Sequence, residues 1–87
     1  MATVFIPAQC RDLTGGVGQV AIEGSSIREI VARLDGQFPG IAARFTQDGA
    51  LMPAIAVSID GAIASRGLLS AVKPESEIHF LPAIGGG

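Results

Sequence analysis

The sequence contains one cysteine, Cys10, and one histidine, His79. A lone cysteine excludes an internal disulfide bond, and these two residues cannot supply the ligand set of a structural zinc site or the thiolates of an iron–sulfur cluster. Only Arg11 lies beside Cys10 as a cation, and no nucleophile or carboxylate lies in evident reach of His79. We therefore expect no metal site, no bound cofactor and no catalytic residue.

The chain also lacks long apolar runs and basic clusters. Hydrophobic residues make up 48% of it, but their runs are far shorter than the roughly 20 residues of a membrane-spanning helix. The net charge is −2 without a basic cluster, which argues against binding to nucleic acid. Residues 1–6 run into a strand pattern and do not resemble a signal peptide. We expect a cytoplasmic protein whose partners are other proteins.

A chain of 87 residues is long enough for one domain with a modest core, and it leaves no room for a separate catalytic domain. The residue pattern divides the chain into a folded part, residues 1–82, and a glycine-rich tail, residues 83–87. We expect this tail to be flexible, because glycine adds no apolar surface to a core and loses the most backbone entropy when it is ordered.

Alternation of apolar and polar residues predicts several strands, the first ended by Pro7 and the last stopped by Pro82. The glycines within residues 13–18 favour a turn, which predicts an N-terminal hairpin. Asp60 and Gly61 form a favoured turn pair between two later strands. The predicted strands cover residues 3–6, 19–23, 54–59, 62–63 and 78–81.

One helix is predicted after the first two strands. Ser26 and Glu29 have the spacing of a capping box, in which the serine hydroxyl accepts from the Glu29 amide and the carboxylate reaches back to the Ser26 amide. Gly36 and residues 39–40 mark the exit, and residues 41–45 should form another short turn. The order of elements predicts an α+β fold, with the helix packed across a sheet. The apolar stripe of this predicted helix contains Ile27, Ile30, Val31, Leu34 and Phe38.

The chain ends in three glycines, Gly85, Gly86 and Gly87. In an extended conformation, the residues from Pro82 onward could reach about 20 Å beyond the domain, far enough to enter the active site of another protein. Without side chains, this backbone can approach ATP or a nucleophile closely, and the terminal carboxylate stays open to attack. Taken alone, such an ending is equally compatible with a frayed terminus or a cloning scar.

Over essentially its whole length, the sequence resembles the MoaD/ThiS family of ubiquitin-like sulfur carriers. The resemblance rests on the order of the elements, the helix exit at residues 38–40, the turn at residues 59–61, and Pro82 placed four residues before Gly86 and Gly87. Two features depart from the family pattern. Gly85 makes the ending a triple glycine, and a polar loop over residues 73–77 stands where many members have an Asp-Gly-Asp turn.

Within the family, the segments 11–16, 39–41 and 81–84 look most like the CysO carriers, which supply sulfur for cysteine synthesis. The resemblance implies a β-grasp fold, a mixed sheet of four or five strands with one main helix packed across it. The first and last strands are neighbours in such a sheet. Phe5 and Leu81 then fall on the face away from the helix, where we interpret them as a docking patch for a partner beside the departing tail.

The resemblance also implies a function for the chain end. An ATP-dependent enzyme similar to the ubiquitin-activating E1 enzymes would adenylate the Gly87 carboxylate, and a sulfur donor would convert it to a thiocarboxylate. Gly85, Gly86 and Ile84 would be the residues by which partners recognise the tail. In a cysteine pathway, a cysteine synthase dependent on pyridoxal phosphate would accept the sulfur and a JAMM-type metalloprotease would release the product. ATP and pyridoxal phosphate belong to these partners.

Two alternatives remain open at this stage. The chain could be the small subunit of molybdopterin synthase, or a ubiquitin-like modifier joined through Gly87 to lysines of other proteins. All three functions share the acyl-adenylate step, so the residues alone do not separate them. Which pathway receives the sulfur, whether for cysteine, molybdopterin, thiamin or a secondary metabolite, is likewise not contained in the sequence.

Overall fold

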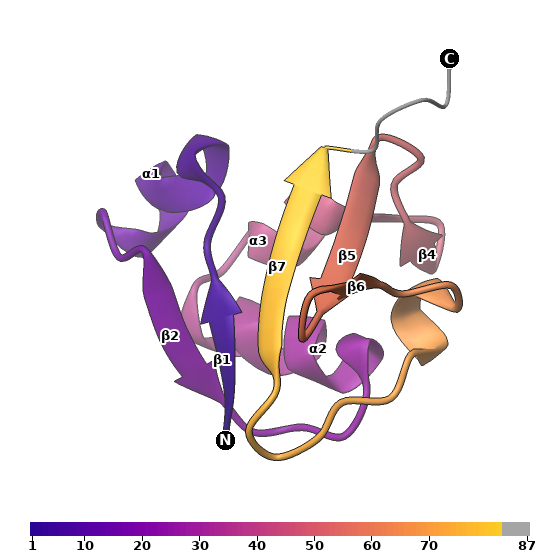
Figure 1. Ribbon diagram of the computed structural model, residues 1–87. Coiled ribbons are helices and arrows are strands. Elements are labelled where there is room, and N and C mark those ends of the chain that lie inside the picture. The colour runs from indigo at the N-terminus through magenta and orange to yellow at the C-terminus, as the bar shows by residue number, and fades with distance from the viewer. Residues whose placement is uncertain (83–87) are drawn as a thin grey trace.

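The computed structural model describes residues 1–82, and residues 83–87 lie outside the described part. Five strands form one mixed sheet in the order β2-β1-β7-β5-β6 (Figure 1). β7 is parallel to β1, and the other neighbouring strands are antiparallel. This confirms the predicted α+β, β-grasp arrangement. The strands are β1 (Ala2–Phe5), β2 (Gln19–Ile22), β5 (Ile55–Ile59), β6 (Ala62–Ile63) and β7 (Glu77–Pro82).

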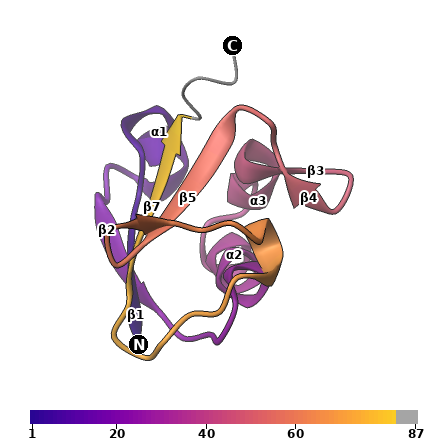
Figure 2. The same ribbon diagram turned by 45° about the vertical axis from the view of Figure 1, so that its right-hand side comes forward.

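Helix α2 (Ile27–Gln37) crosses one face of this sheet, as the apolar stripe predicted (Figure 2). The Ser26 hydroxyl accepts a hydrogen bond from the Glu29 amide at 3.2 Å, which confirms the first half of the capping box. The second half was predicted wrongly. The Glu29 carboxylate accepts from the amide of Ser25, not Ser26, at 2.9 Å, because Ser26 is in an extended conformation that leaves the preceding amide within reach.

The exit of α2 differs slightly from the prediction, since Gly36 lies inside the helix and Phe38 follows its last residue. Helix α3 (Ile41–Phe45) begins after Gly40, which has a φ of 100°. The Asp35 carboxylate accepts hydrogen bonds from the amides of Gly40 and Ala42, at 3.1 and 3.0 Å. These bonds satisfy amides at the start of α3, and thereby hold it against the end of α2.

The core lies between the sheet and the two helices α2 and α3. From β7, Ile78 and Phe80 point into it, and Phe80 stacks on Phe45 of α3 with ring centroids 4.1 Å apart. Four residues of the α2 stripe are buried and the fifth, Phe38, is partly buried. The fully buried side chains include Val4, Ile6, Ile27, Ile30, Leu34, Ile41, Phe45, Val57 and Ile78.

The predicted N-terminal hairpin is wrong in its connection. β1 and β2 do pair, but the chain between them forms a 3-10 turn η1 (Ala8–Cys10) and a short helix α1 (Arg11–Thr14). Gly15, with a φ of 67°, ends α1 and does not form a tight hairpin turn. The buried Thr14 hydroxyl lies within hydrogen-bonding distance, 2.9 Å, of the Val17 carbonyl, so this segment folds on itself.

Two further differences concern strands. A small hairpin of β3 (Thr46–Gln47) and β4 (Ala50–Leu51) was not predicted, although Asp48-Gly49 repeats the turn chemistry of Asp60-Gly61. The last strand includes Pro82, which pairs with Ile55 of β5. No β1 residue pairs with β7 beyond His79, so the amide hydrogen that proline lacks is not needed on that edge.

Replacing Leu34 by alanine should reduce the free energy of unfolding by about 2–5 kcal/mol, because the side chain is fully buried under the sheet. That is a large part of the stability of a small domain. Urea unfolding followed by circular dichroism measures the change. Arg33→Ala, one residue earlier and exposed on the same helix, is the control and should change stability by less than about 0.5 kcal/mol. Equal effects of the two substitutions would show that the buried face of α2 is misassigned.

Candidate functional site

The predicted sulfur-carrying and tail-recognition residues, Ile84, Gly85, Gly86 and Gly87, lie outside the described residues and stay predictions. The structure shows where the segment that precedes them is held. β7 lies between β1 and β5 and runs parallel to β1. The last residue of β7, Pro82, and the first residue of β1 therefore lie at opposite ends of the sheet (Figure 1). The candidate site is therefore the exit of β7 together with the sheet surface beside it.

A carboxylate anchors the start of β7. The Asp60 carboxylate accepts a hydrogen bond from the Glu77 amide at 2.8 Å and another from the Ser76 hydroxyl at 3.0 Å. Ser76 is buried, although the sequence places it in a polar loop. These bonds to the charged form, first from the Glu77 amide and then from Ser76, lower the pKa of Asp60. The β5–β6 turn and the loop before β7 are thus joined at one residue.

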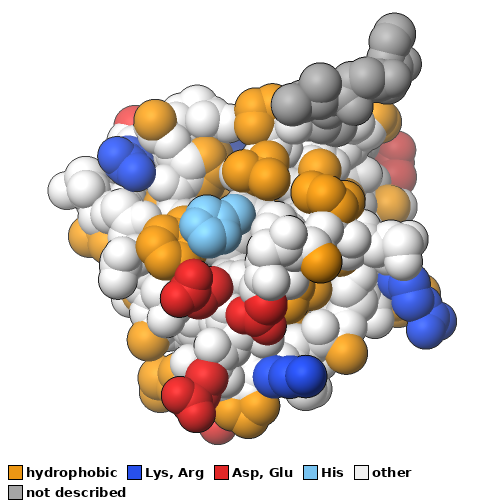
Figure 3. Space-filling view, in the orientation of Figure 1, with side chains coloured by type: hydrophobic (Ala, Val, Ile, Leu, Met, Phe, Trp, Pro, Cys, Tyr) orange, Lys and Arg blue, Asp and Glu red, His pale blue; other side chains and the backbone are white. Residues whose placement is uncertain are grey.

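The outer face of the sheet, away from α2, carries the predicted docking residues. Phe5 on β1 stacks on His79 of β7, with ring centroids 4.2 Å apart and planes 6° from parallel. Leu81 lies two residues beyond His79 on the same face, opposite Ala56 of β5, and is 36% exposed. Hydrophobic side chains gather on this face over the upper ends of β5 and β7 (Figure 3). We call Phe5, His79, Leu81 and Ala56 the exit patch.

The sequence located the exit patch but missed its internal contact. His79 faces away from Ile78 and Phe80, as predicted, and is half-buried by its stacking on Phe5. This leaves Leu81 as the patch's most exposed apolar side chain. The sequence could not predict this contact because it depends on the register of β1 against β7, which pairs Phe5 with His79. Alternation within one strand does not show which residues of two neighbouring strands lie side by side. The docking role of Phe5 and Leu81 remains a prediction.

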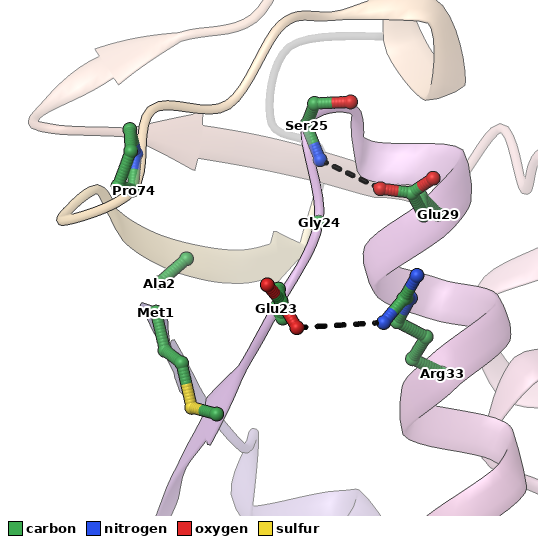
Figure 4. A pocket seen from close by; sticks show the side chains of 8 residues that line it. All are labelled: Met1, Ala2, Glu23, Gly24, Ser25, Glu29, Arg33 and Pro74. Carbon is green, nitrogen blue, oxygen red and sulfur yellow. Dashed lines mark hydrogen bonds and ion pairs between the residues drawn. The ribbon is translucent and has the colours of Figure 1, made fainter.

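A cavity at the opposite end of the sheet is lined by several polar residues (Figure 4). Its volume is 370 Å³. Glu23 and Arg33 form an exposed ion pair at 3.8 Å, and the Glu29 carboxylate is bound to the Ser25 amide. The charged side chains that line it, those of Glu23, Glu29 and Arg33, are therefore engaged within the described part of the chain.

Cys10 is the only thiol, and it is buried. Burial raises its pKa, and the opposing effect of the nearby Arg44 guanidinium does not reverse this. The sequence suggested Arg11 as its cationic neighbour, but the fold places Arg44 there, in an ion pair with Asp12 at 3.0 Å. Within residues 1–82, no group of three or more histidine, cysteine, aspartate or glutamate residues could hold a metal ion.

A mixed five-stranded sheet that packs across one main helix, with the last strand central, defines the ubiquitin-like β-grasp class. The chain matches the ThiS family over residues 4–87 and belongs to that family. This confirms the resemblance to sulfur carriers of the MoaD/ThiS type. No match was found among curated protein sequences. In the part of the chain that the structure describes, no helix is long and apolar enough to cross a membrane.

Solved structures give the same result. A chain of the crystal structure of the Amycolatopsis orientalis BexX/CysO complex is 32% identical, with full coverage of both chains (100% and 100%) and a TM-score of 0.92. Mycobacterium tuberculosis CysO is 26% identical over 97% of this chain and 100% of its own, with a TM-score of 0.88. Small archaeal modifier protein 1 from Methanosarcina acetivorans shares the fold at 22% identity, 99% and 95% coverage and a TM-score of 0.79.

Replacing Asp60 by asparagine should lower stability at neutral pH and flatten its dependence on pH. The folded-state pKa of Asp60 is lower than that of the unfolded chain, so the charged form stabilises the fold above about pH 4. That contribution is lost as the pH falls from there through the folded-state pKa. Urea unfolding at a series of pH values should show the difference between wild type and Asp60→Asn shrinking below about pH 4.

Asp48→Asn is the matched control for this experiment. Asp48 also precedes a glycine in a turn with positive φ, 54° against 52° for Asp60, and its carboxylate accepts no hydrogen bond from residues 1–82. Asparagine tolerates this conformation in both turns. If Asp48→Asn and Asp60→Asn had the same pH-dependent effect, the anchoring of β7 by Asp60 would be wrong.

Replacing Leu81 by serine should leave stability nearly unchanged and weaken docking of an activating enzyme. The side chain lies on the outer face and is 36% exposed, so little core packing is lost. Surface plasmon resonance with the enzyme should show an affinity lowered on the order of tenfold if Leu81 is a central contact. Leu69→Ser, at a leucine that is 64% exposed on the helix side of the domain, should bind this enzyme normally. Unchanged binding of Leu81→Ser would remove the exit patch from the docking interface.

Proposed function

We propose that this chain is a sulfur carrier whose Gly87 carboxylate is converted to a thiocarboxylate. The observation that supports this most is the family match, which extends through the three terminal glycines. The geometry is compatible with it, because a central strand held by β1, β5 and the Asp60 anchor leads the chain to the exit patch. In this proposal the folded domain, residues 1–82, positions the chain for partner enzymes, and residues 83–87 carry the reacting group.

The proposed cycle has two covalent steps, both performed in partner enzymes. A carboxylate is a poor electrophile, so an oxygen of Gly87 first attacks the α-phosphorus of ATP in an E1-like enzyme, and pyrophosphate leaves. Hydrosulfide supplied by the sulfur donor then attacks the acyl carbon, the acyl–oxygen bond breaks, AMP leaves and the proton on sulfur is lost to water. The resulting thiocarboxylate is ionised at neutral pH and nucleophilic. The carrier is a co-substrate of these enzymes and contributes no catalytic residue.

We propose cysteine biosynthesis as the receiving pathway. The support is the similarity, at 32% and 26% identity over nearly the whole chain, to structures of CysO proteins. A cysteine synthase that uses pyridoxal phosphate would accept the sulfur, and a JAMM-type metalloprotease would release the product from the carrier. The Amycolatopsis structure is of a complex with BexX, which supports recognition of carriers of this shape by a separate protein. We propose that these reactions take place in the cytoplasm.

Removing Gly86 and Gly87 should abolish sulfur loading without changing the melting temperature, because glycine has no side chain to add to a core. The full chain and the truncated chain are each incubated with an E1-like enzyme, ATP and a sulfur donor, and intact masses are measured. Only the full chain should gain the mass of one oxygen-to-sulfur exchange. Sulfur loading of the truncated chain would refute the assignment of Gly87, and isopeptide-linked products in place of the exchange would identify a protein modifier.

A sulfur-transfer experiment separates the possible recipients. The loaded chain is incubated in separate reactions with a cysteine synthase and with the large subunit of molybdopterin synthase, each supplied with its own sulfur-accepting substrate, and loss of the thiocarboxylate mass is followed in each. We expect transfer to the cysteine synthase. Transfer only to the molybdopterin subunit would keep the carrier function but replace the pathway.

A further inference from the structure

A second surface, on the side of the domain away from the exit patch, has the features of a docking groove. Two cavities of 210 and 390 Å³ lie side by side there and share the residues Arg28, Gly49 and Leu68. They lie between α2, the β3–β4 hairpin and the turn η2 (Gly67–Leu69), segments that meet on the right of Figure 2. We call these two cavities together the helix-side groove.

The helix-side groove is apolar, with positive charge at its margins. Leu51 and Leu68 contribute to its walls, and Leu69 at its edge is 64% exposed. Arg28 and Arg66 are the charged residues that line it, and no aspartate or glutamate does. Arginine is enriched in protein interfaces, and apolar cavities open to solvent can receive the anchoring side chains of a partner.

The two arginines are not neutralised within the described chain. Among residues 1–82, ion pairs engage Arg33 and Arg44, but none engages Arg28 or Arg66. The acids of α2 are directed elsewhere, because Glu29 accepts from the Ser25 amide and Asp35 from the amides that start α3. A positive, apolar groove on a chain of net charge −2 therefore differs in sign from the molecule as a whole.

We propose that the helix-side groove binds a segment of a partner protein that presents consecutive large apolar side chains flanked by carboxylates. Two adjacent cavities with a common wall suit neighbouring side chains of a peptide. Guanidinium groups bind carboxylates through paired hydrogen bonds, which would set the register of the segment. Since the groove and the exit patch lie on opposite sides of the sheet, one partner can hold the domain here while another acts at the end of β7. The proposal goes beyond the sulfur chemistry and does not depend on it.

The test selects peptides from a random-peptide phage library on the full-length chain. Enriched peptides should combine leucine, isoleucine or phenylalanine with aspartate or glutamate. Added to the ¹⁵N-labelled chain, a selected peptide should shift the amide resonances of Arg28, Gly49 and Leu68 and leave those of Phe5 and His79 unchanged. Enrichment of peptides without acids, or shifts confined to the exit patch, would overturn the proposal.

Charge reversal provides the matched comparison. Arg28→Glu combined with Arg66→Glu should weaken binding of the selected peptide on the order of tenfold or more, whereas Arg33→Glu, on the same helix but outside the groove, should not. All three side chains are exposed, so the variants should fold. Equal binding by the double variant and the wild type would refute the role of the two arginines.

Two other occupants would be recognised in the same spectra and would each overturn the proposal. If a second copy of the chain fills the groove, its resonances will shift with protein concentration before any peptide is added. If the chain's own C-terminal residues fill it, Ile84→Ser in the full-length chain will shift the groove resonances of the free protein. We expect neither change.

Discussion

The arrangement of this domain depends on one constraint, the burial of β7 in the middle of the sheet. β7 pairs with β1 on one side and β5 on the other, while Ile78 and Phe80 fill the core beneath it. A strand in this position cannot shift by one residue without exposing its core side chains. The Asp60 carboxylate adds a polar anchor at the strand's start. The position of Pro82, the last described residue, is thereby set by the most constrained element.

This constraint suits so small a domain to the proposed carrier function. A group that is delivered to a partner's active site needs a rigid origin, because an imprecise origin lowers the local concentration at the target. The sheet supplies that origin, and its two sides differ in the chemistry of their surfaces. The exit patch is apolar and contains the Phe5–His79 stack, whereas the helix-side groove is apolar and bounded by arginines. A protein with two surfaces of different chemistry can bind two different partners selectively, one at each surface.

Local pattern was sufficient for most elements and insufficient for a few. The capped helix, the strands around Asp60-Gly61 and the last strand are formed by residues that agree with them in propensity and alternation. The antiparallel pairing of β1 and β2 was predicted, but the tight turn assumed between them was wrong because the glycines after Thr14 end a helix that local pattern did not show. The β3–β4 hairpin was missed because two-residue strands are too short to display alternation.

The sequence by itself determined the class of fold, the helix face that is buried and the terminal glycines on which the proposed function rests, since each depends on neighbours along the chain. Tertiary structure decided which distant residues meet. Three examples join separate elements. Phe5 stacks on His79, and Asp60 accepts hydrogen bonds from Ser76 and Glu77. Arg28 and Arg66 line the same cavity of the helix-side groove. The physical reason is that strand register and helix packing bring these groups together, and neither is encoded in the spacing of residues within one segment.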